Sequence, residues 1–134
     1  MNLNNNIRYV TFSLGGMIFE YDEDKNQRNI EKHGISFRSA ARVFFDYDRI
    51  ELYDEENSNT EDRYDTIGDV SAGNLNIENN IDTTIGLVGK DDILFVVYTE
   101  RIRRLEAGKE ITVTRIISAR YATNFERGIY YGKY

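Results

Sequence analysis

The sequence contains no cysteine, proline or tryptophan, and it has a single histidine. Without cysteine the chain cannot form disulfides, use a catalytic thiol or build a cysteine-ligated zinc site. Without proline its turns must be made by Gly, Asn, Asp or Ser. No apolar run has the length of a membrane helix, and no secretory signal is visible, so we expect a cytoplasmic protein with no membrane association.

Charge is distributed unevenly along the 134 residues, which carry a net charge of −6. Acidic residues dominate 46–65, and basic residues dominate 101–127. A net-acidic protein is not a general nucleic-acid binder, but a local basic face can still bind RNA. The acidic segment could receive a basic partner, although such runs most often form a solvated surface.

The stretch 93–120 is the strongest structural signal. Residues 93–98 form a short apolar run of branched and aromatic side chains, and 111–119 begin with strand-like alternation. We predict two central antiparallel strands. Arginines follow the first strand and lie in and after the second: Arg101, Arg103, Arg104, Arg115 and Arg120. They could bind a phosphate backbone, or they could simply pair with the many carboxylates.

Local signals predict the remaining elements. Asp22, Ser36 and Thr123 are suitable helix N-caps, and Gly34 is a suitable C-cap. The expected helices are 23–33, 37–45 and 124–131, and the other expected strands are 7–14, 17–21, 49–53 and 63–68. The predicted fold class is α+β: an antiparallel sheet with two helices on the N-terminal side and a C-terminal helix, packed mainly on one face.

The chain is expected to form one domain. Because Met17 is an internal methionine, residues 1–16 are interpreted as an N-terminal extension. Residues 17–134 would be the domain, with an inserted loop at about 69–86, where Gly, Asn and Asp are frequent.

His33 is the only candidate for histidine acid–base chemistry. Imidazole titrates near neutral pH, which suits proton transfer, but a surface or capping histidine is an equally good interpretation. The sequence shows no spacing typical of a metal site, no phosphate-binding loop and no nucleophile elbow. We therefore expect no metal and no cofactor.

Four pieces occur together in an order that resembles the BrnT family of bacterial type II toxins. They are Phe19-Glu-Tyr-Asp-Glu-Asp-Lys25, then Asn29-Ile-Glu-Lys-His-Gly-Ile-Ser-Phe37, then Glu61-Asp-Arg-Tyr64 with Ile67-Gly68, and finally Val96–Arg101 with Arg115–Thr123. The resemblance implies a small RelE-like ribonuclease that cleaves RNA without a metal and inhibits translation. It also implies a BrnA-like ribbon-helix-helix antitoxin as partner, with DNA contacted only through that antitoxin.

The resemblance implies roles for particular residues. Lys32, His33, Arg63 and Arg120 are the candidate catalytic residues. Arg101, Arg115 and Tyr98 are the candidate RNA-binding residues, with Tyr98 stacking on a base. Arg115 lies within a strand and could instead be an internal ion-pair partner.

Two other functions stay open at this point. The chain could keep the fold and the antitoxin-binding surface without catalysis, acting as a co-repressor or interaction module. It could also be an unrelated α+β binding domain, which would neither cleave RNA nor bind an antitoxin.

Overall fold

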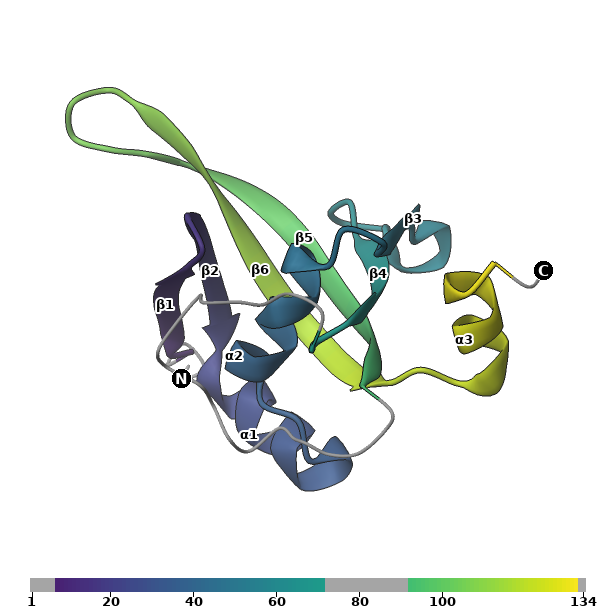
Figure 1. Cartoon of the computed structure of the whole chain (residues 1–134). Coiled ribbons are helices and arrows are strands. Elements are labelled where there is room, and N and C mark those ends of the chain that lie inside the picture. The colour runs from purple at the N-terminus through teal and green to yellow at the C-terminus, as the bar shows by residue number, and fades with distance from the viewer. Residues whose placement is uncertain (1–6, 72–91, 133–134) are drawn as a thin grey trace.

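The two central strands, β5 (Ile93–Arg104) and β6 (Glu110–Tyr121), form the antiparallel pair expected from the sequence. The structure, a computed structural model, describes residues 7–71 and 92–132. Around this pair the described strands form one six-stranded sheet in the order β1-β2-β6-β5-β4-β3 (Figure 1). The other strands are β1 (Tyr9–Leu14), β2 (Met17–Asp22), β3 (Ile50–Tyr53) and β4 (Tyr64–Asp69).

The sheet is mixed, because β2 pairs with β6 in parallel whereas the other pairs are antiparallel. The predicted α+β class is confirmed, but the antiparallel description does not extend to this one pair. Sequence alone could not show it, since β2 and β6 are separated by about ninety residues and each reads as an ordinary strand.

The helix boundaries follow the capping signals closely. Helix α1 (Glu23–His33) begins after Asp22, whose side chain accepts hydrogen bonds from two backbone N–H groups, and it ends at Gly34 in the left-handed conformation with φ 73°. The second predicted helix is α2 (Phe37–Ala40) continued by the 3₁₀ helix η2 (Ala41–Phe45). Helix α3 (Asn124–Tyr130) carries the expected capping box between Thr123 and Glu126.

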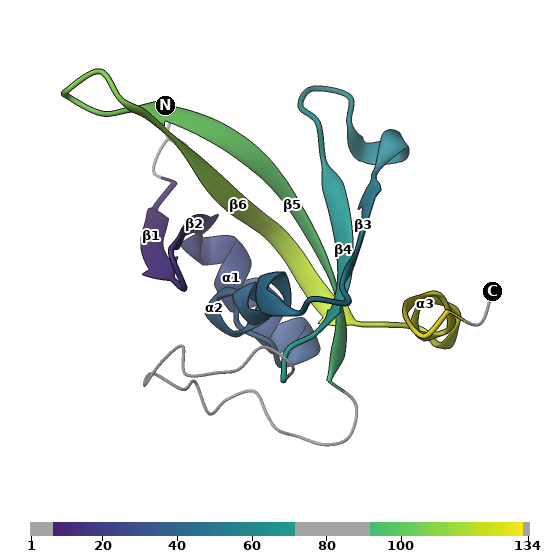
Figure 2. The ribbon, with the colours of Figure 1, turned by 45° about the horizontal axis from the view of Figure 1, so that its top comes forward.

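The main core lies between the sheet and the helices α1, α2 and η2. Leu94, Val96 and Tyr98 of β5 point into it and pack with aromatic residues of β2 and η2. A second, smaller cluster lies on the opposite face of the sheet, where Phe95 packs with residues of α3. The expectation that the helices cover mainly one face therefore fails for α3, which lies apart from α1 and α2 (Figure 2).

Helix α1 substitutes for a neighbouring strand at β6. The Asn29 side chain donates to the carbonyl of Ala119 at 2.8 Å and accepts from its N–H at 3.2 Å. A strand partner makes the same two kinds of bond. Strand β2 pairs with β6 only through residues 113–115. Asn29 provides hydrogen-bond partners for the backbone of β6 at Ala119, beyond this pairing, and so fixes the C-terminal half of α1 beside the strand.

Strands β5 and β6 extend further than predicted and form a long hairpin closed by residues 105–109. Figure 1 shows this hairpin projecting beyond its neighbouring strands. The 3₁₀ helix η3 (Glu55–Asn57) lies in the acidic loop before β4. Residues 72–86 of the predicted inserted loop lie outside the described residues, whereas residues 9–14 of the predicted extension form β1. In the described part of the chain, no helix is both long and apolar enough to cross a membrane.

Candidate functional site

The face of the sheet opposite α1 and α2 carries the charged residues that the sequence singled out. On β5, Phe95, Val97 and Thr99 alternate with the core-facing residues, and their partners on β6 include Arg120, Ser118 and Arg115. A β-bulge leaves Ile117 as an extra residue between Ile116 and Ser118, and this keeps Arg115 and Arg120 on one face. On β4, Asp65 opposes Val97. We call this surface the site face.

Arg120 is held firmly on the site face. Its Nη1 and Nη2 atoms donate to the two carboxylate oxygens of Glu126 at 2.8 and 2.9 Å, and its guanidinium lies 4.2 Å from the centre of the Phe95 ring. Glu126 is itself fixed by the capping box at the start of α3. About a third of the Arg120 side chain stays exposed, so a preorganised cation is presented to solvent.

His33 is the last residue of α1, which Asn29 holds beside β6, the strand that carries Arg120. Burial, followed by the positive charges of Lys32 and Arg120, lowers the pKa of His33 below its ordinary value of 6.5. At neutral pH the imidazole is therefore mostly uncharged and able to accept a proton. The structure thus brings together two of the predicted catalytic residues, His33 and Arg120, with the exposed side chain of Lys32 beside them.

Asp65 is a site-face residue that the sequence analysis did not identify. Burial, a hydrogen bond with the Asp54 carboxyl group and the negative charge of Asp54 raise its pKa to about 7. The positive charge of Arg120 lowers the pKa of Asp65, and the negative charge of Glu126 raises it. The Oδ1 atom of Asp65 is buried and has no hydrogen-bond partner in the described structure. This carboxyl group therefore holds a proton at a pH where other carboxyl groups are ionised.

Arg63 and Arg101 converge on Glu61. Arg63 Nη2 lies 3.3 Å from Glu61 Oε2, and Arg101 Nη2 lies 3.5 Å from Glu61 Oε1. The Nε atoms of both arginines are buried without an acceptor among the described residues. Both side chains keep some exposure, 29% for Arg63 and 40% for Arg101, so their accessible N–H groups can still meet an anionic ligand.

Arg115 is mainly structural in this arrangement. Its Nε donates to Glu20 at 2.7 Å, and its guanidinium lies 4.2 Å from the centre of the Tyr9 ring. Glu20 is fully buried and also binds Arg103. The ion-pair alternative considered for Arg115 therefore describes its contacts, although part of its side chain also lines a pocket.

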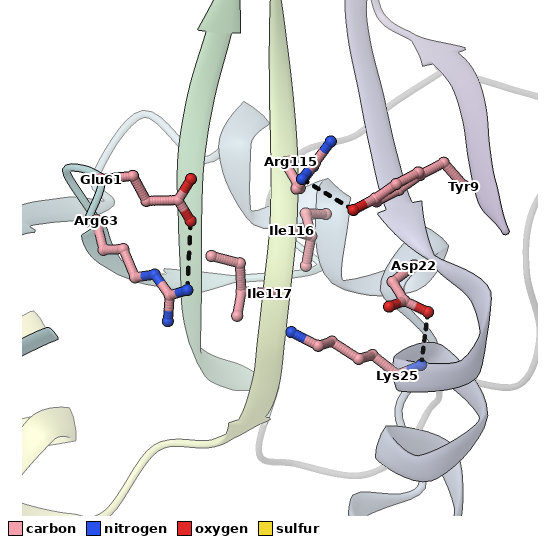
Figure 3. Close-up of a pocket in the computed structure, with 8 residues that line it drawn as sticks. All are labelled: Tyr9, Asp22, Lys25, Glu61, Arg63, Arg115, Ile116 and Ile117. Atoms are coloured by element: carbon pink, nitrogen blue, oxygen red, sulfur yellow. Dashed lines mark hydrogen bonds and ion pairs between the residues drawn. The ribbon is translucent and has the colours of Figure 1, made fainter. Parts of the chain in front are cut away.

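That pocket lies where β1, β6, the start of α1 and the loop before β4 meet (Figure 3). In Figure 3, Lys25 extends from α1 toward Ile117, and Arg63 reaches toward Ile117 from the other side. The lining combines three cations with two carboxylates and three less polar side chains: Lys25, Arg63, Arg115, Asp22, Glu61, Tyr9, Ile116 and Ile117. Its balance of charge suits a phosphate group better than an apolar ligand.

Tyr98 does not lie on the site face. It is 6% exposed in the main core, where its ring packs edge-on against Phe44 at 4.9 Å and beside Tyr64 at 5.6 Å. Both contacts occupy the ring, so the geometry gives no support to the predicted stacking on a base.

Sequence reasoning missed Lys25, Asp65 and Glu126 as site residues. Lys25 belongs to the first of the four recurring pieces, but nothing distinguished it from the other charges of a polar helix. Glu126 was recognised only as a helix cap. Asp65 gave no signal, because its proton affinity depends on Asp54 and on burial between strands.

The arrangement can perform proton transfer beside an anion site. A fixed guanidinium and a protonated carboxyl group lie on the site face, and a neutral imidazole lies at the end of α1, which Asn29 holds beside β6. Within the described residues, no three His, Asp or Glu side chains are grouped so that they could hold a metal ion.

Comparison with known proteins identifies one family. Residues 21–77 match the model of the BrnT family, described as the ribonuclease toxin BrnT of a type II toxin–antitoxin system. The match confirms the resemblance over residues 21–77, which include Lys32, His33 and Arg63, whereas Arg101, Arg115 and Arg120 lie outside the matched segment. No curated protein matched the chain. This part of the chain is therefore similar to a ribonuclease toxin of a type II toxin–antitoxin system.

Proposed function

We propose that the chain is a metal-independent endoribonuclease that cleaves RNA and thereby inhibits translation in the cytoplasm. The observation that carries the proposal is the placement of His33, which lies within the segment that matches a ribonuclease toxin family, at the end of α1 beside β6, the strand that carries Arg120. Such cleavage needs a base for the ribose 2′-OH, cations for the phosphorane and an acid for the leaving 5′-oxygen.

In this proposal, His33 is the general base. Its pKa is lowered by burial, Lys32 and Arg120, so the imidazole is free to accept a proton at neutral pH. Arg120 binds the scissile phosphate, because its guanidinium is preorganised by Glu126 and Phe95. Lys32 adds positive charge next to the base.

The RNA backbone extends from Arg120 toward Arg63 and Arg101. Both side chains are partly exposed, so their guanidinium groups can donate to phosphate oxygens that approach the site face. Arg115 borders the same path through the pocket, where Lys25 supplies a further cation. The acidic net charge makes this binding weak at high salt, since phosphate contacts supply most of the affinity for RNA.

The partner in this proposal is a BrnA-like antitoxin with a ribbon-helix-helix fold, and DNA is contacted only through that antitoxin. The domain that performs these functions comprises residues 17–134, with residues 1–16 as an extension and an insertion at about 69–86.

One observation favours the non-catalytic alternative, an antitoxin-binding co-repressor. Each candidate arginine is already paired with a carboxylate: Arg63 and Arg101 with Glu61, Arg115 with Glu20, and Arg120 with Glu126. A substrate phosphate must compete with these carboxylates. The two functions differ in one measurable property, which is cleavage of RNA by the purified chain.

The test is cleavage of a labelled RNA in EDTA at low salt by the wild type, Arg120→Ala and Arg38→Ala. Arg38 is a matched control, because its guanidinium also lies over an aromatic ring, that of Phe12 at 4.5 Å, but away from the site face. We expect Arg120→Ala to lose about 100-fold or more in rate and Arg38→Ala to retain the wild-type rate. No cleavage by the wild type would favour the co-repressor.

A further inference from the structure

Arg120 lies between two groups able to exchange protons. His33 reaches it from α1, which Asn29 fixes beside β6. Asp65 approaches from β4, which is separated from β6 by β5. The positive charge of Arg120 acts on both groups. It lowers the pKa of His33, and it also lowers the pKa of Asp65. The elements that carry the three groups follow one another in the order α1, β6, β5 and β4, so the imidazole and the carboxyl group come from opposite sides of the strand that carries Arg120.

This order is the one that in-line cleavage of RNA requires. The attacking 2′-oxygen and the leaving 5′-oxygen lie on opposite sides of the phosphorus atom. A base and an acid that serve these two oxygens must therefore flank the cation that holds the phosphate. His33 and Asp65 flank Arg120 in this way.

Asp65 is also the carboxyl group on the site face that is best suited to hold a proton. Glu126 is bound to Arg120 by two hydrogen bonds; burial alone would raise its pKa, but these bonds and those from Thr123 lower it. Glu61 is paired with Arg63 and Arg101. Asp65, by contrast, has an unpartnered buried oxygen and faces another carboxyl group.

The neighbour of Asp65 is arranged to remain ionised. The Asp54 carboxylate accepts hydrogen bonds from the Asn57 backbone and side chain at 3.1 to 3.3 Å. Burial would raise the pKa of Asp54, but these bonds and the contact with Asp65 lower it overall. Two carboxyl groups in contact cannot both ionise easily, so the shared proton resides on Asp65.

We propose that Asp65 is the general acid of the reaction and donates its proton to the leaving 5′-oxygen. This inference rests on the ribonuclease function proposed above. The 2′-oxygen forms a bond to phosphorus as its proton passes to the His33 imidazole, and the P–O5′ bond breaks as the Asp65 proton passes to the 5′-oxygen. The products are a 2′,3′-cyclic phosphate and a 5′-hydroxyl group. Proton exchange with water then returns His33 and Asp65 to their starting states.

The decisive test compares Asp65→Asn on two RNA substrates that differ at one atom. In the first the leaving group is the natural 5′-oxygen, and in the second it is a 5′-bridging sulfur, which leaves without protonation. Asparagine has nearly the shape of aspartate but no acidic proton. We expect Asp65→Asn to be about 100-fold slower than wild type on the oxygen substrate and within about threefold of it on the sulfur substrate.

Arg120→Ala is the comparison variant in this experiment. Because Arg120 binds the phosphate itself, its loss slows cleavage of both substrates. A variant that is slow only on the oxygen substrate has therefore lost a general acid. Loss of a phosphate contact, or of the fold, would slow cleavage of both substrates. An Asp65→Asn protein that is equally slow on both substrates, or as fast as wild type on both, overturns the role of Asp65.

A second variant, Asp54→Asn, tests the same role without changing Asp65. Asparagine caps a helical turn as well as aspartate does, so the loop is expected to fold normally. The groups that face Asp65 are Asp54, Arg120 and Glu126, and only the first of these changes. Removing the Asp54 charge lowers the pKa of Asp65, so the alkaline decline in cleavage rate should begin at a lower pH. An unchanged alkaline decline contradicts the inference.

The outcomes also separate this inference from the function on which it rests. If the wild type cleaves RNA and Asp65→Asn has no effect, the ribonuclease function stands and only the role of Asp65 as general acid is rejected. No cleavage of either substrate by the wild type removes both.

Discussion

The Tyr130 hydroxyl donates a hydrogen bond of 2.6 Å to Asp46 Oδ2 and joins α3 to the end of η2. Asp46 is buried and also accepts from the backbone N–H groups of Asp48 and Asp69. The contact therefore fixes α3 on the site face, and with it Glu126, which holds Arg120.

Tyr130→Phe is expected to lower the free energy of unfolding by about 1–2 kcal/mol, because a hydrogen bond to a buried carboxylate is lost while the ring keeps its packing. Urea denaturation measures the change. Tyr131→Phe is the matched control, since Tyr131 is 59% exposed, and it should change stability by less than about 0.5 kcal/mol. Equal effects of the two substitutions would contradict the role of the Asp46 contact.

Asn29→Ala is expected to cost more, about 2–4 kcal/mol, because it leaves the Ala119 N–H and carbonyl without their partner and also removes the bond to the Ile35 carbonyl. Thermal or urea unfolding measures the loss. Gln27→Ala, on an exposed part of the same helix, controls for helix propensity. A loss at Asn29 no larger than at Gln27 would show that α1 does not depend on this bond for its place beside β6.

His33→Ala is expected to slow RNA cleavage by about 100-fold with the fold unchanged, as for removal of a general base. The pKa of His33 is lowered from 6.5, so the imidazole becomes protonated only below about pH 6.5. We therefore expect wild-type activity to decline on the acid side only below this pH. A pH–rate profile measures both. Glu31→Ala, an exposed neighbour on α1, should leave the profile as it is.

Asp65 makes stability depend on pH in a direction opposite to that of most carboxyl groups. Its pKa is about 7 in the folded chain and about 4 when unfolded. The folded state thus holds the proton more tightly, so the stabilisation is fully present below about pH 4 and is lost as pH rises through 7. Asp65→Asn should remove this decline and be more thermostable than wild type at pH 8 by a few degrees.

Thermal melting of both proteins at pH 5 and pH 8 measures the effect. At pH 5 Asp65 is protonated in the folded wild type, so the two melting temperatures should differ less than at pH 8. A difference that does not change between these pH values would show that Asp65 titrates normally.

Features set by neighbouring residues were predictable from the sequence. The caps at Asp22, Gly34 and Thr123 placed α1 and α3 to within a residue or two, since each cap acts on backbone groups only a few positions away. The first two strands and the central pair of strands were also predicted, since strand patterns and apolar runs are local in sequence. His33 and Arg120 were predicted as site residues by resemblance, and their catalytic roles stay predictions; the positive charge of Arg120 contributes to the lowered pKa of His33.

Features that depend on distant pairing were not predictable. The parallel contact of β2 with β6 and the bond from Asn29 to Ala119 each join segments about ninety residues apart. The core position of Tyr98 depends on which face of β5 the helices cover, and a continuous apolar run does not show this. The proton affinity of Asp65 arises only when β4 lies beside Asp54 in the folded chain.

The strand order also has a consequence for the timing of protein synthesis. A ribosome makes β1 first, yet β6, which lies between β2 and β5 and carries Arg120, is followed only by α3 among the described elements. Until residues 110–121 have emerged, no strand pairs with both β2 and β5, and Asn29 has no backbone of β6 to bind. Assembly must await these long-range contacts. A chain that stops before residue 120 therefore lacks Arg120 and cannot complete the proposed site.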